Sequence, residues 1–238
     1  MKYLDRIKDE PRRESYTKAD LLKNDYLIAS ETDLDIYYAP FDYINKDASV
    51  VIVGITPGWT QMEKSYRTLI TELNKGNSYE NALRKVKSES SFAGSMRTNL
   101  VKMLDELGLH KKLNITSTSE LFGANSDLLH STSALRYPVF TFGKNYTGST
   151  PSPLKNKLLW SQIETHLVSE ISMFIDALIV PLGKNVNDIL LELKSSGSIS
   201  NNNILSGFPH PSGANGHRAK QFEANKTQMM KKIEQWQY

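Results

Sequence analysis

Two short stretches of this chain combine residue types that catalytic loops use. The first, residues 54–58, reads Gly-Ile-Thr-Pro-Gly, and the second contains His210-Pro211-Ser212. A histidine exchanges protons near neutral pH, whereas the hydroxyl of Thr56 or Ser212 can orient water or bind a phosphate but cannot take a proton from water at that pH. We therefore expect these two loops to carry the chemistry of the protein.

A buried strand is expected to position the first loop. Residues 50–53 read Val-Val-Ile-Val without polar alternation, which is typical of a strand covered on both faces in a parallel or mixed sheet. Ligands bind such sheets beyond the carboxyl ends of the strands. Gly54 and Gly58 allow a close backbone approach, and Pro57 favours an extended Thr56. Taken alone, the loop is explained equally well as a tight exit from the strand.

Together with a third segment, the two loops resemble the active-site motifs of the uracil-DNA glycosylase superfamily. In that family Gly-x-x-Pro-Gly follows the first core strand, as residues 54–58 do here, and His-Pro-Ser follows the last, as residues 210–212 do. Residues 177–182, followed by Gly183, resemble the penultimate core strand. The resemblance covers residues 48–236 and implies an α/β fold of three α/β/α layers around a short, mainly parallel, four-stranded sheet.

The composition suits a single globular domain. The 238 residues carry 29 Lys and Arg against 26 Asp and Glu, and the net charge of +3 permits nucleic-acid binding without requiring it. We expect one domain over residues 1–238, with residues 1–33 as an N-terminal helical extension. The absence of cysteine excludes disulfides and a cysteine-bound metal cluster. No apolar run approaches the ~20 residues of a membrane span and no signal peptide is evident, so we expect a cytoplasmic monomer.

Periodicity predicts the elements that surround these loops. Apolar spacing, caps and glycine stops indicate helices, and short branched or alternating runs indicate strands. We expect helices at residues 17–29, 61–74, 79–86, 97–107, 160–175, 186–194 and from 218 onward, strands at 34–38, 127–134, 177–182 and before His210, and loops at 88–96 and 135–148. The last helix is expected to turn Phe222, Met229, Ile233 and Trp236 inward.

The resemblance implies roles for individual residues in a DNA glycosylase. His210 would stabilise the negative charge of the departing base, as an oxyanion hole does, and a histidine held by local backbone is the alternative. Thr56 stands where the most active uracil-specific members carry Asp, so it would orient the attacking water without deprotonating it. Ser212 and the amides around Gly213 would bind a DNA phosphate. Further DNA contacts are implied for Asn215, His217 and Arg218, although Arg218 could simply open the last helix.

Substrate-binding residues are implied at the ends of two strands: Gly54, Ile55, Gly58, Trp59, Ser131, Thr132 and Ser133. The Asn with which the family reads the pyrimidine edge is absent, and one of the three hydroxyl residues takes its place, depending on register. Gly58 stands where uracil-specific members place a Tyr that blocks C5 substituents, which predicts room for a bulkier base. Trp59 would stack on the flipped base, wedge the duplex or cap the core.

These departures from uracil-specific members favour a modified or damaged pyrimidine as the substrate. The resemblance implies an enzyme that flips a nucleotide and hydrolyses its N-glycosidic bond, with DNA as partner and no metal or organic cofactor. The motifs contain no lysine, the nearest being Lys64, which favours a monofunctional glycosylase. A hypermodified cytosine of phage DNA, such as glucosylated hydroxymethylcytosine, would imply antiviral defence. Uracil excision in repair, a non-catalytic DNA-binding module and a small-molecule hydrolase are the alternatives.

Overall fold

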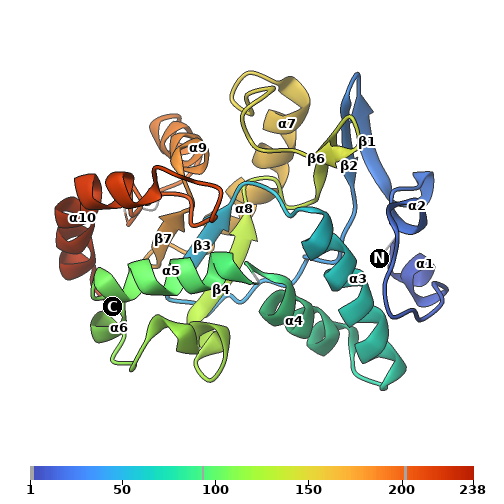
Figure 1. The fold of residues 1–238 in the computed structure, drawn as a ribbon, viewed down its shortest axis with the longest axis horizontal. Helices are drawn as coiled ribbons and strands as arrows, with labels where there is room; N and C mark the ends of the chain where they lie inside the picture. Colours follow the sequence, from blue (N-terminus) through green and yellow to red (C-terminus); the bar gives the residue numbers. More distant parts are fainter. Residues whose placement is uncertain (1–2, 93, 201–202) are drawn as a thin grey trace.

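A short parallel sheet forms the centre of the computed structural model, which describes residues 3–92, 94–200 and 203–238. Its strands are β3 (Val50–Gly54), β4 (Leu129–Ser133) and β7 (Leu178–Pro181), arranged in the order β4-β3-β7 (Figure 1). All residues of the central strand β3 are buried. The lack of alternation in residues 50–53 therefore predicted this strand correctly, because both of its faces are covered.

The fourth strand of the expected sheet is reduced to a single bridge. Ile204 pairs with Ile179 in the parallel sense, outside any regular strand. The chain then turns at Gly207, which has a left-handed φ of +88°, and continues into Pro209. Since a proline has no N–H to add to the ladder, pairing stops before His210. The structure thus corrects the expected sheet to three strands and one bridge.

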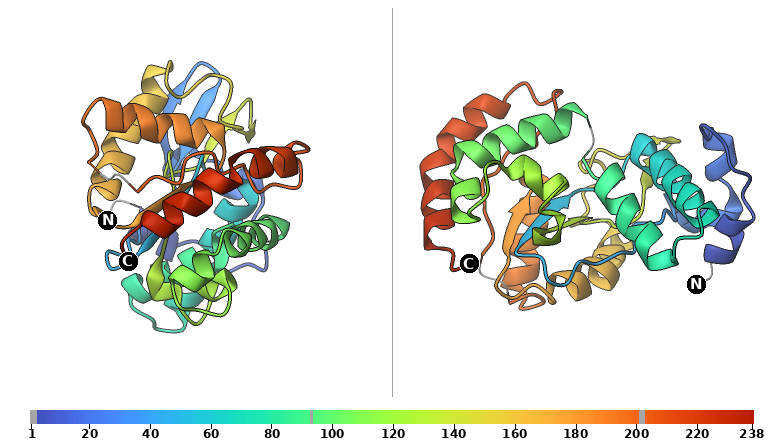
Figure 2. Two further views of the ribbon diagram at one scale, coloured as in Figure 1. Left: turned by 90° about the vertical axis from the view of Figure 1, so that its left-hand side faces the viewer. Right: turned by 90° about the horizontal axis from the view of Figure 1, so that it is seen from below.

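Helices cover both faces of this sheet and form the three layers that the sequence predicts. One face carries α7 (Lys157–Gln162), the π-helix η4 (Ile163–Val168), α8 (Ser169–Ile171) and α9 (Lys184–Ser195). The other face carries α5 (Ser95–Glu106), α6 (Leu109–Lys112) and α10 (Arg218–Gln235). Figure 2 shows α5 and α10 running close to one another on that side.

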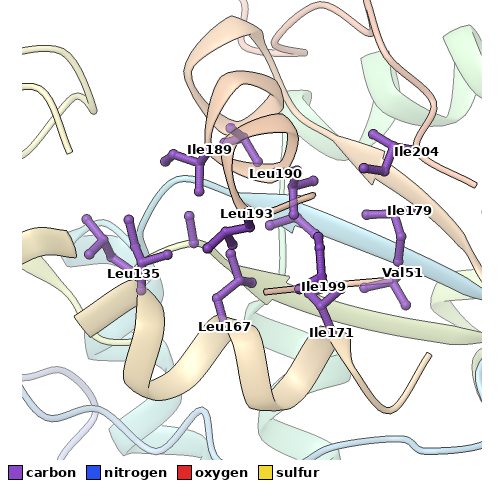
Figure 3. Close-up of a cluster of buried hydrophobic side chains, with 14 of the residues drawn as sticks. Val51, Leu135, Leu167, Ile171, Ile179, Ile189, Leu190, Leu193, Ile199 and Ile204 are labelled. Atoms are coloured by element: carbon purple, nitrogen blue, oxygen red, sulfur yellow. The ribbon is translucent and has the colours of Figure 1, made fainter. Parts of the chain in front are cut away.

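The side chains of β3 alternate between the two layers. Val51 lies in one core with residues of β7, η4, α8 and α9: Ile179, Leu167, Ile171, Ile189, Leu190 and Leu193 (Figure 3). Val50 and Ile52 lie in the other core, which also contains Phe222, Met229, Ile233 and Trp236. These last four residues are buried, as the sequence predicts.

The structure contains a second, antiparallel sheet in places where the sequence predicts a helix and a loop. It consists of β1 (Leu27–Glu31), β2 (Leu34–Tyr37), β5 (Val139–Thr141) and β6 (Lys144–Asn145). The helix expected over residues 17–29 is only the short α2 (Lys18–Leu21), so the N-terminal extension is not wholly helical. Asn24 and Asp25 are weak helix formers, and a turn with Thr32 at φ +51° returns the chain onto β2. Part of the loop expected at residues 135–148 is paired in the same sheet.

The remaining helices lie around the second sheet or beside the core of the central sheet that contains α5. Around the second sheet lie α1 (Leu4–Lys8), α3 (Trp59–Asn74), α4 (Tyr79–Ser90) and the 3₁₀ helix η1 (Asn24–Tyr26), and beside that core lie the 3₁₀ helices η2 (Thr118–Phe122) and η3 (Ser126–Leu128). α3 begins directly after the first loop, and α4 runs past its predicted end at residue 86 to Ser90. Within the described residues, no helix has both the length and the apolar character to cross a bilayer.

Candidate active site

A small cavity lies at the carboxyl ends of β3 and β4, where the sequence predicts the site. We call it the strand-end cavity; its lining consists of Phe41, Pro57, Gln61, Lys87, Ser91, Phe92, Ser131, Thr132, Ser133 and Arg136. Its volume is about 20 Å³. Since a water molecule needs ~10–15 Å³ of such space, the cavity has room for about one water and is too small for a base in this conformation.

The ring of Phe92 closes the strand-end cavity against the end of β3. A Cβ atom at Gly54 would lie 3.1 Å from Phe92 Cε1, so the glycine allows this close approach. Phe92 is 7% exposed and has a φ of +51°, which is uncommon for a bulky side chain. The sequence predicts a loop here but no role for Phe92. Its one signal is that it is the aromatic residue in a stretch of small and polar residues.

The three hydroxyl residues of β4 all line this cavity. The choice among them, which the sequence left open, is therefore not needed to place a hydroxyl at the site. Ser131 donates a hydrogen bond from Oγ to Ser91 Oγ at 2.7 Å. Thr132 is 5% exposed, and its Oγ1 has no hydrogen-bond partner among the described residues. Ser133 is paired with Gly54 across the two strands. A buried hydroxyl without a partner is uncommon, which makes Thr132 a candidate ligand contact.

Lys87 of α4 is a buried cation that sequence reasoning missed. β4 is the edge strand of the central sheet, and Lys87 Nζ donates to its outward carbonyl at Ser131 at 2.8 Å. Asn45 Nδ2 donates in the same way to Leu129 O at 3.0 Å. Lys87 is 7% exposed, and burial lowers its pKa to about 8. An ammonium has three donors, and the hydrogen bond to Ser131 O uses one of them.

A buried ionic network holds the second cation of the cavity, Arg136. Its Nη2 lies 2.5 Å from Glu170 Oε2, and Glu170 Oε1 lies 2.5 Å from His130 Nε2. Glu170 is 1% exposed. Burial alone would raise the pKa of Glu170, but the hydrogen bond from His130 and the charges of Lys87 and Arg136 lower that pKa overall. The glutamate therefore remains ionised and fixes Arg136 in place.

Thr56, the predicted water-orienting residue, braces the loop in the structure. Its Oγ1 donates to Tyr137 O at 3.0 Å and accepts from Val139 N at 3.2 Å. A hydroxyl has one proton to donate, and here the backbone takes it. The neighbouring Ile55 packs against the core that contains Val51. It also packs against Gly148, where a Cβ atom would lie 2.6 Å from Ile55 Cγ1. Neither side chain lines the strand-end cavity.

The open side predicted at Gly58 is filled. A Cβ atom at Gly58 would lie 3.1 Å from Asn145 Nδ2, and Asn145 Oδ1 accepts the amide of Trp59 at 2.9 Å. Asn145 belongs to β6, which the sequence did not predict, so this correction follows from the second sheet. The Trp59 side chain is half-buried and packs against the core around α1 and α3, which agrees with the core-capping alternative.

His210 is held in one tautomer by its own loop. The Ser212 amide donates to His210 Nδ1 at 3.3 Å, so the neutral ring carries its proton on Nε2. Burial lowers the pKa of His210, which keeps the ring neutral at pH 7. Gly183, with φ +91°, allows the approach, since a Cβ there would lie 3.0 Å from His210 Cβ. His210 lines a separate cavity of about 340 Å³ with Gly183 and Asn215.

The residues predicted to bind DNA shape the loop that carries His210. Arg218 begins α10 and donates to Ser212 O at 2.7 Å, while Ser212 Oγ accepts the Ala214 amide at 3.2 Å. Asn215 donates to His210 O at 3.2 Å and accepts the His217 amide at 3.2 Å. Gly213 and His217 are exposed. The alternative role of Arg218, at the start of the last helix, is thus realised.

The comparisons with known proteins identify the family of the chain. Within the described residues, no group of three or more His, Asp or Glu side chains is placed to hold a metal ion. The chain is 43% identical to the "Uncharacterized protein YoxB" of Bacillus subtilis (strain 168) over 221 residues, which cover 92% of this chain and 86% of that protein. No solved structure matches. A sequence profile of the Uracil DNA glycosylase superfamily matches residues 41–236, and the chain therefore belongs to that superfamily.

Proposed function

We propose that this protein is a monofunctional DNA glycosylase that flips a nucleotide into the strand-end cavity and hydrolyses the N-glycosidic bond of a modified or damaged pyrimidine. The observation that carries the proposal is the buried ammonium of Lys87, which has no carboxylate partner among the described residues and lines that cavity beside Arg136, whose charge is paired with Glu170. As the bond breaks, its electron pair leaves with the base, which becomes anionic, and the sugar becomes cationic. Preorganised positive charge in a buried site stabilises such an anion strongly.

His210 supports the same chemistry from the second loop. Its Nε2 carries the proton of the neutral ring, because the Ser212 amide occupies Nδ1, and no acceptor for it is found among the described residues. A neutral donor of this kind can hydrogen-bond a carbonyl oxygen of the base as charge develops on it. His210 lies outside the strand-end cavity, so we assign it to the oxygen nearest the sugar and the two cations to the far edge of the base.

The small volume of the cavity requires a movement when the base enters. Phe92 fills the space beside Gly54, and Gly94 with φ +79° starts α5 shortly after it. We propose that the Phe92 ring swings aside and then covers the face of the base. The described lining includes no carboxylate, so water would add to the sugar cation without a strong general base. Thr56 then acts as a brace of the loop.

For the specific base we propose a hypermodified cytosine of phage DNA, and hence a role in antiviral defence. The support is the hydroxyl lining of β4, where the family places a pyrimidine-reading Asn. The substrate DNA would be bound by the loop around Gly213 and His217, both exposed beside His210. Uracil excision in repair is the alternative enzyme function, and a non-catalytic DNA-binding module is the alternative from another class.

Release of the free base, detected by mass spectrometry, tests this proposal. Duplexes containing uracil and phage DNA containing modified cytosines are incubated with the wild-type protein and with His210→Ala, and strand cleavage by alkali reports abasic sites. Release of a modified base alone supports the proposal, and release of uracil alone supports repair. DNA binding without release of any base would leave the binding module. Trapping by borohydride would reveal a Schiff base of a lysine with the sugar and overturn the monofunctional assignment.

A further inference from the structure

A second, larger cavity adjoins the strand-end cavity along the outer edge of β4. We call it the edge cleft; its volume is about 210 Å³. Its lining consists of Tyr43, Asn45, Asn81, Arg84, Lys85, Lys87, Ser88, Ser91, Leu121, Phe122, Ser126, Asp127, Leu129, His130 and Ser131. Lys87, Ser91 and Ser131 line both cavities, so the two spaces are neighbours across these side chains.

The shared side chains form a partition that rotamer changes can open. Ser91 and Ser131 are joined by one hydrogen bond between their hydroxyls, of 2.7 Å. Lys87 extends from α4 on a flexible four-carbon chain and donates to the Ser131 carbonyl. A group bound at this junction can replace the hydroxyl contact with hydrogen bonds of its own.

The size of the edge cleft fits a substituent comparable to a hexose. At ~10–15 Å³ for each water, the cleft has room for on the order of ten water molecules, whereas the strand-end cavity has room for about one. The strand-end cavity can therefore accept a base only by the movement of Phe92. The edge cleft already has the space that an added group would require.

The charges of the edge cleft favour a neutral, polar group. Arg84 is paired with Asp127, and Lys85 is paired with Glu89 at 3.3 Å, so these two cations are compensated. Amide and hydroxyl side chains of Asn81, Ser88 and Ser126 supply hydrogen-bonding groups, and the rings of Tyr43 and Phe122 supply apolar faces. Away from Lys87, which stands at the junction with the strand-end cavity, this mixture suits a hydroxyl-rich ring better than a phosphate or an aliphatic chain.

Lys87 is the hydrogen-bond donor that the structure places at the junction of the two cavities. It is nine-tenths buried and has one described hydrogen bond, to Ser131 O, for three donors. Thr132 Oγ1, without a partner among the described residues, lines the strand-end cavity beside it. Lys87 can bond to a ligand that spans the partition and is placed for an oxygen atom that links the base to its substituent, while Thr132 is placed for the base itself.

We propose that the strand-end cavity and the edge cleft form one bipartite pocket for a pyrimidine that carries a neutral, hydroxyl-rich substituent, such as a hexose on a hydroxymethyl group. The base occupies the strand-end cavity, the substituent passes Lys87, and the edge cleft holds it. This inference rests on the proposed glycosylase function, which it deepens by naming the subsite and the class of substituent.

Narrowing the edge cleft tests the inference. Asn81 is exposed on α4 and lines the cleft, so Asn81→Trp adds a large side chain there without disturbing the core. Glu80→Trp is the matched control, because Glu80 is an exposed neighbour on the same helix and lies outside the cleft lining. Base release is compared on duplexes that contain hydroxymethylcytosine or its glucosylated form. We expect Asn81→Trp to lower the ratio of glucosylated to unsubstituted release by about tenfold or more, and Glu80→Trp to leave that ratio as in the wild type.

A binding measurement separates failure of the inference from failure of the proposed function. A 2′-fluoro substituent on the glucosylated nucleotide destabilises the sugar cation and so prevents cleavage. Even if no base is released from any DNA, preferential binding of this duplex by the wild-type protein, lost in Asn81→Trp, would support the edge cleft as the subsite. An unchanged release ratio in Asn81→Trp, or equal binding of glucosylated and unsubstituted duplexes by the wild type, would overturn it.

Discussion

Replacement of Lys87 by Met should separate its contribution to function from its contribution to stability. Burial lowers the pKa of Lys87 from 10.5 to about 8. At about 1.4 kcal/mol for each pKa unit, holding the charged ammonium in the folded state at pH 7 destabilises the protein by about 3 kcal/mol. The unfolded chain binds more protons between pH 8 and 10.5, so folding stability rises with pH across that window.

The uncharged side chain removes this penalty but leaves a carbonyl without its donor. An unsatisfied Ser131 carbonyl at the edge of β4 costs about 1–3 kcal/mol. We therefore expect Lys87→Met to unfold at pH 7 with a free energy equal to the wild type or up to about 2 kcal/mol higher. Base release should nevertheless fall about 10²–10³-fold, because a buried donor to the leaving base is gone.

Urea unfolding at pH 7 and pH 10, together with single-turnover release of the base, measures both effects. Lys102→Met is the control, since Lys102 is exposed on α5. The wild type should gain stability between the two pH values by more than Lys87→Met does. Several kcal/mol of destabilisation in Lys87→Met, or an unchanged pH response, would refute the burial argument. A stable variant that releases base at the wild-type rate would remove Lys87 from the mechanism.

The remaining predictions concern the two loops. His210→Gln should slow base release about 10²–10³-fold. Because burial lowers the pKa of His210, the wild type should retain activity as pH falls through 6.5 and lose it only at lower pH, when protonation breaks the bond from the loop amide. A rate profile in which activity already falls as the pH drops through 6.5 would contradict the assignment. Thr56→Val should lower the unfolding free energy in urea by about 1–3 kcal/mol, whereas Thr56→Ser, which keeps the hydroxyl, should not. Gly54→Ala should reduce stability by about 1–3 kcal/mol through overpacking against the ring that closes the cavity. Thermal unfolding checks this against Gly216→Ala, where no atom lies within 4 Å of the added carbon.

The central sheet was predictable because local sequence determines its strands. Runs of branched apolar residues without alternation mark β3 and β7, and their buried faces need no knowledge of distant partners. The second sheet was not predictable in this way. β1 is held by pairing with β2, and β2 by pairing with β5, about a hundred residues further along the chain. The loss of the predicted opening at Gly58 follows from this, because Asn145 reaches Gly58 only through that pairing.

The polar residues of the site could be predicted only where they stand at a position of a family motif. The three hydroxyls of β4 were placed by the resemblance, and all of them line the strand-end cavity. Lys87 lies in a run of charged residues on an amphipathic helix, which in sequence indicates a solvated face. Its burial depends on the edge of β4. Arg136 and Glu170 are likewise far apart in sequence, and only the fold joins them to His130.

The position of Lys87 suggests why β4 can lack the pyrimidine-reading Asn of its superfamily. An Asn at the strand end would read the base from the sheet, whereas here the donors stand on α4 and on the segment after β4, at Lys87 and Arg136. Under the proposed function, a cation supplied from α4 would reach the base past the edge of the sheet, which is the side on which the edge cleft lies. A donor on the helix instead of the strand would then provide charge for the leaving base and leave a route for its substituent. A wild-type protein that excised uracil and rejected every substituted pyrimidine would show that the relocated donor serves the leaving group alone.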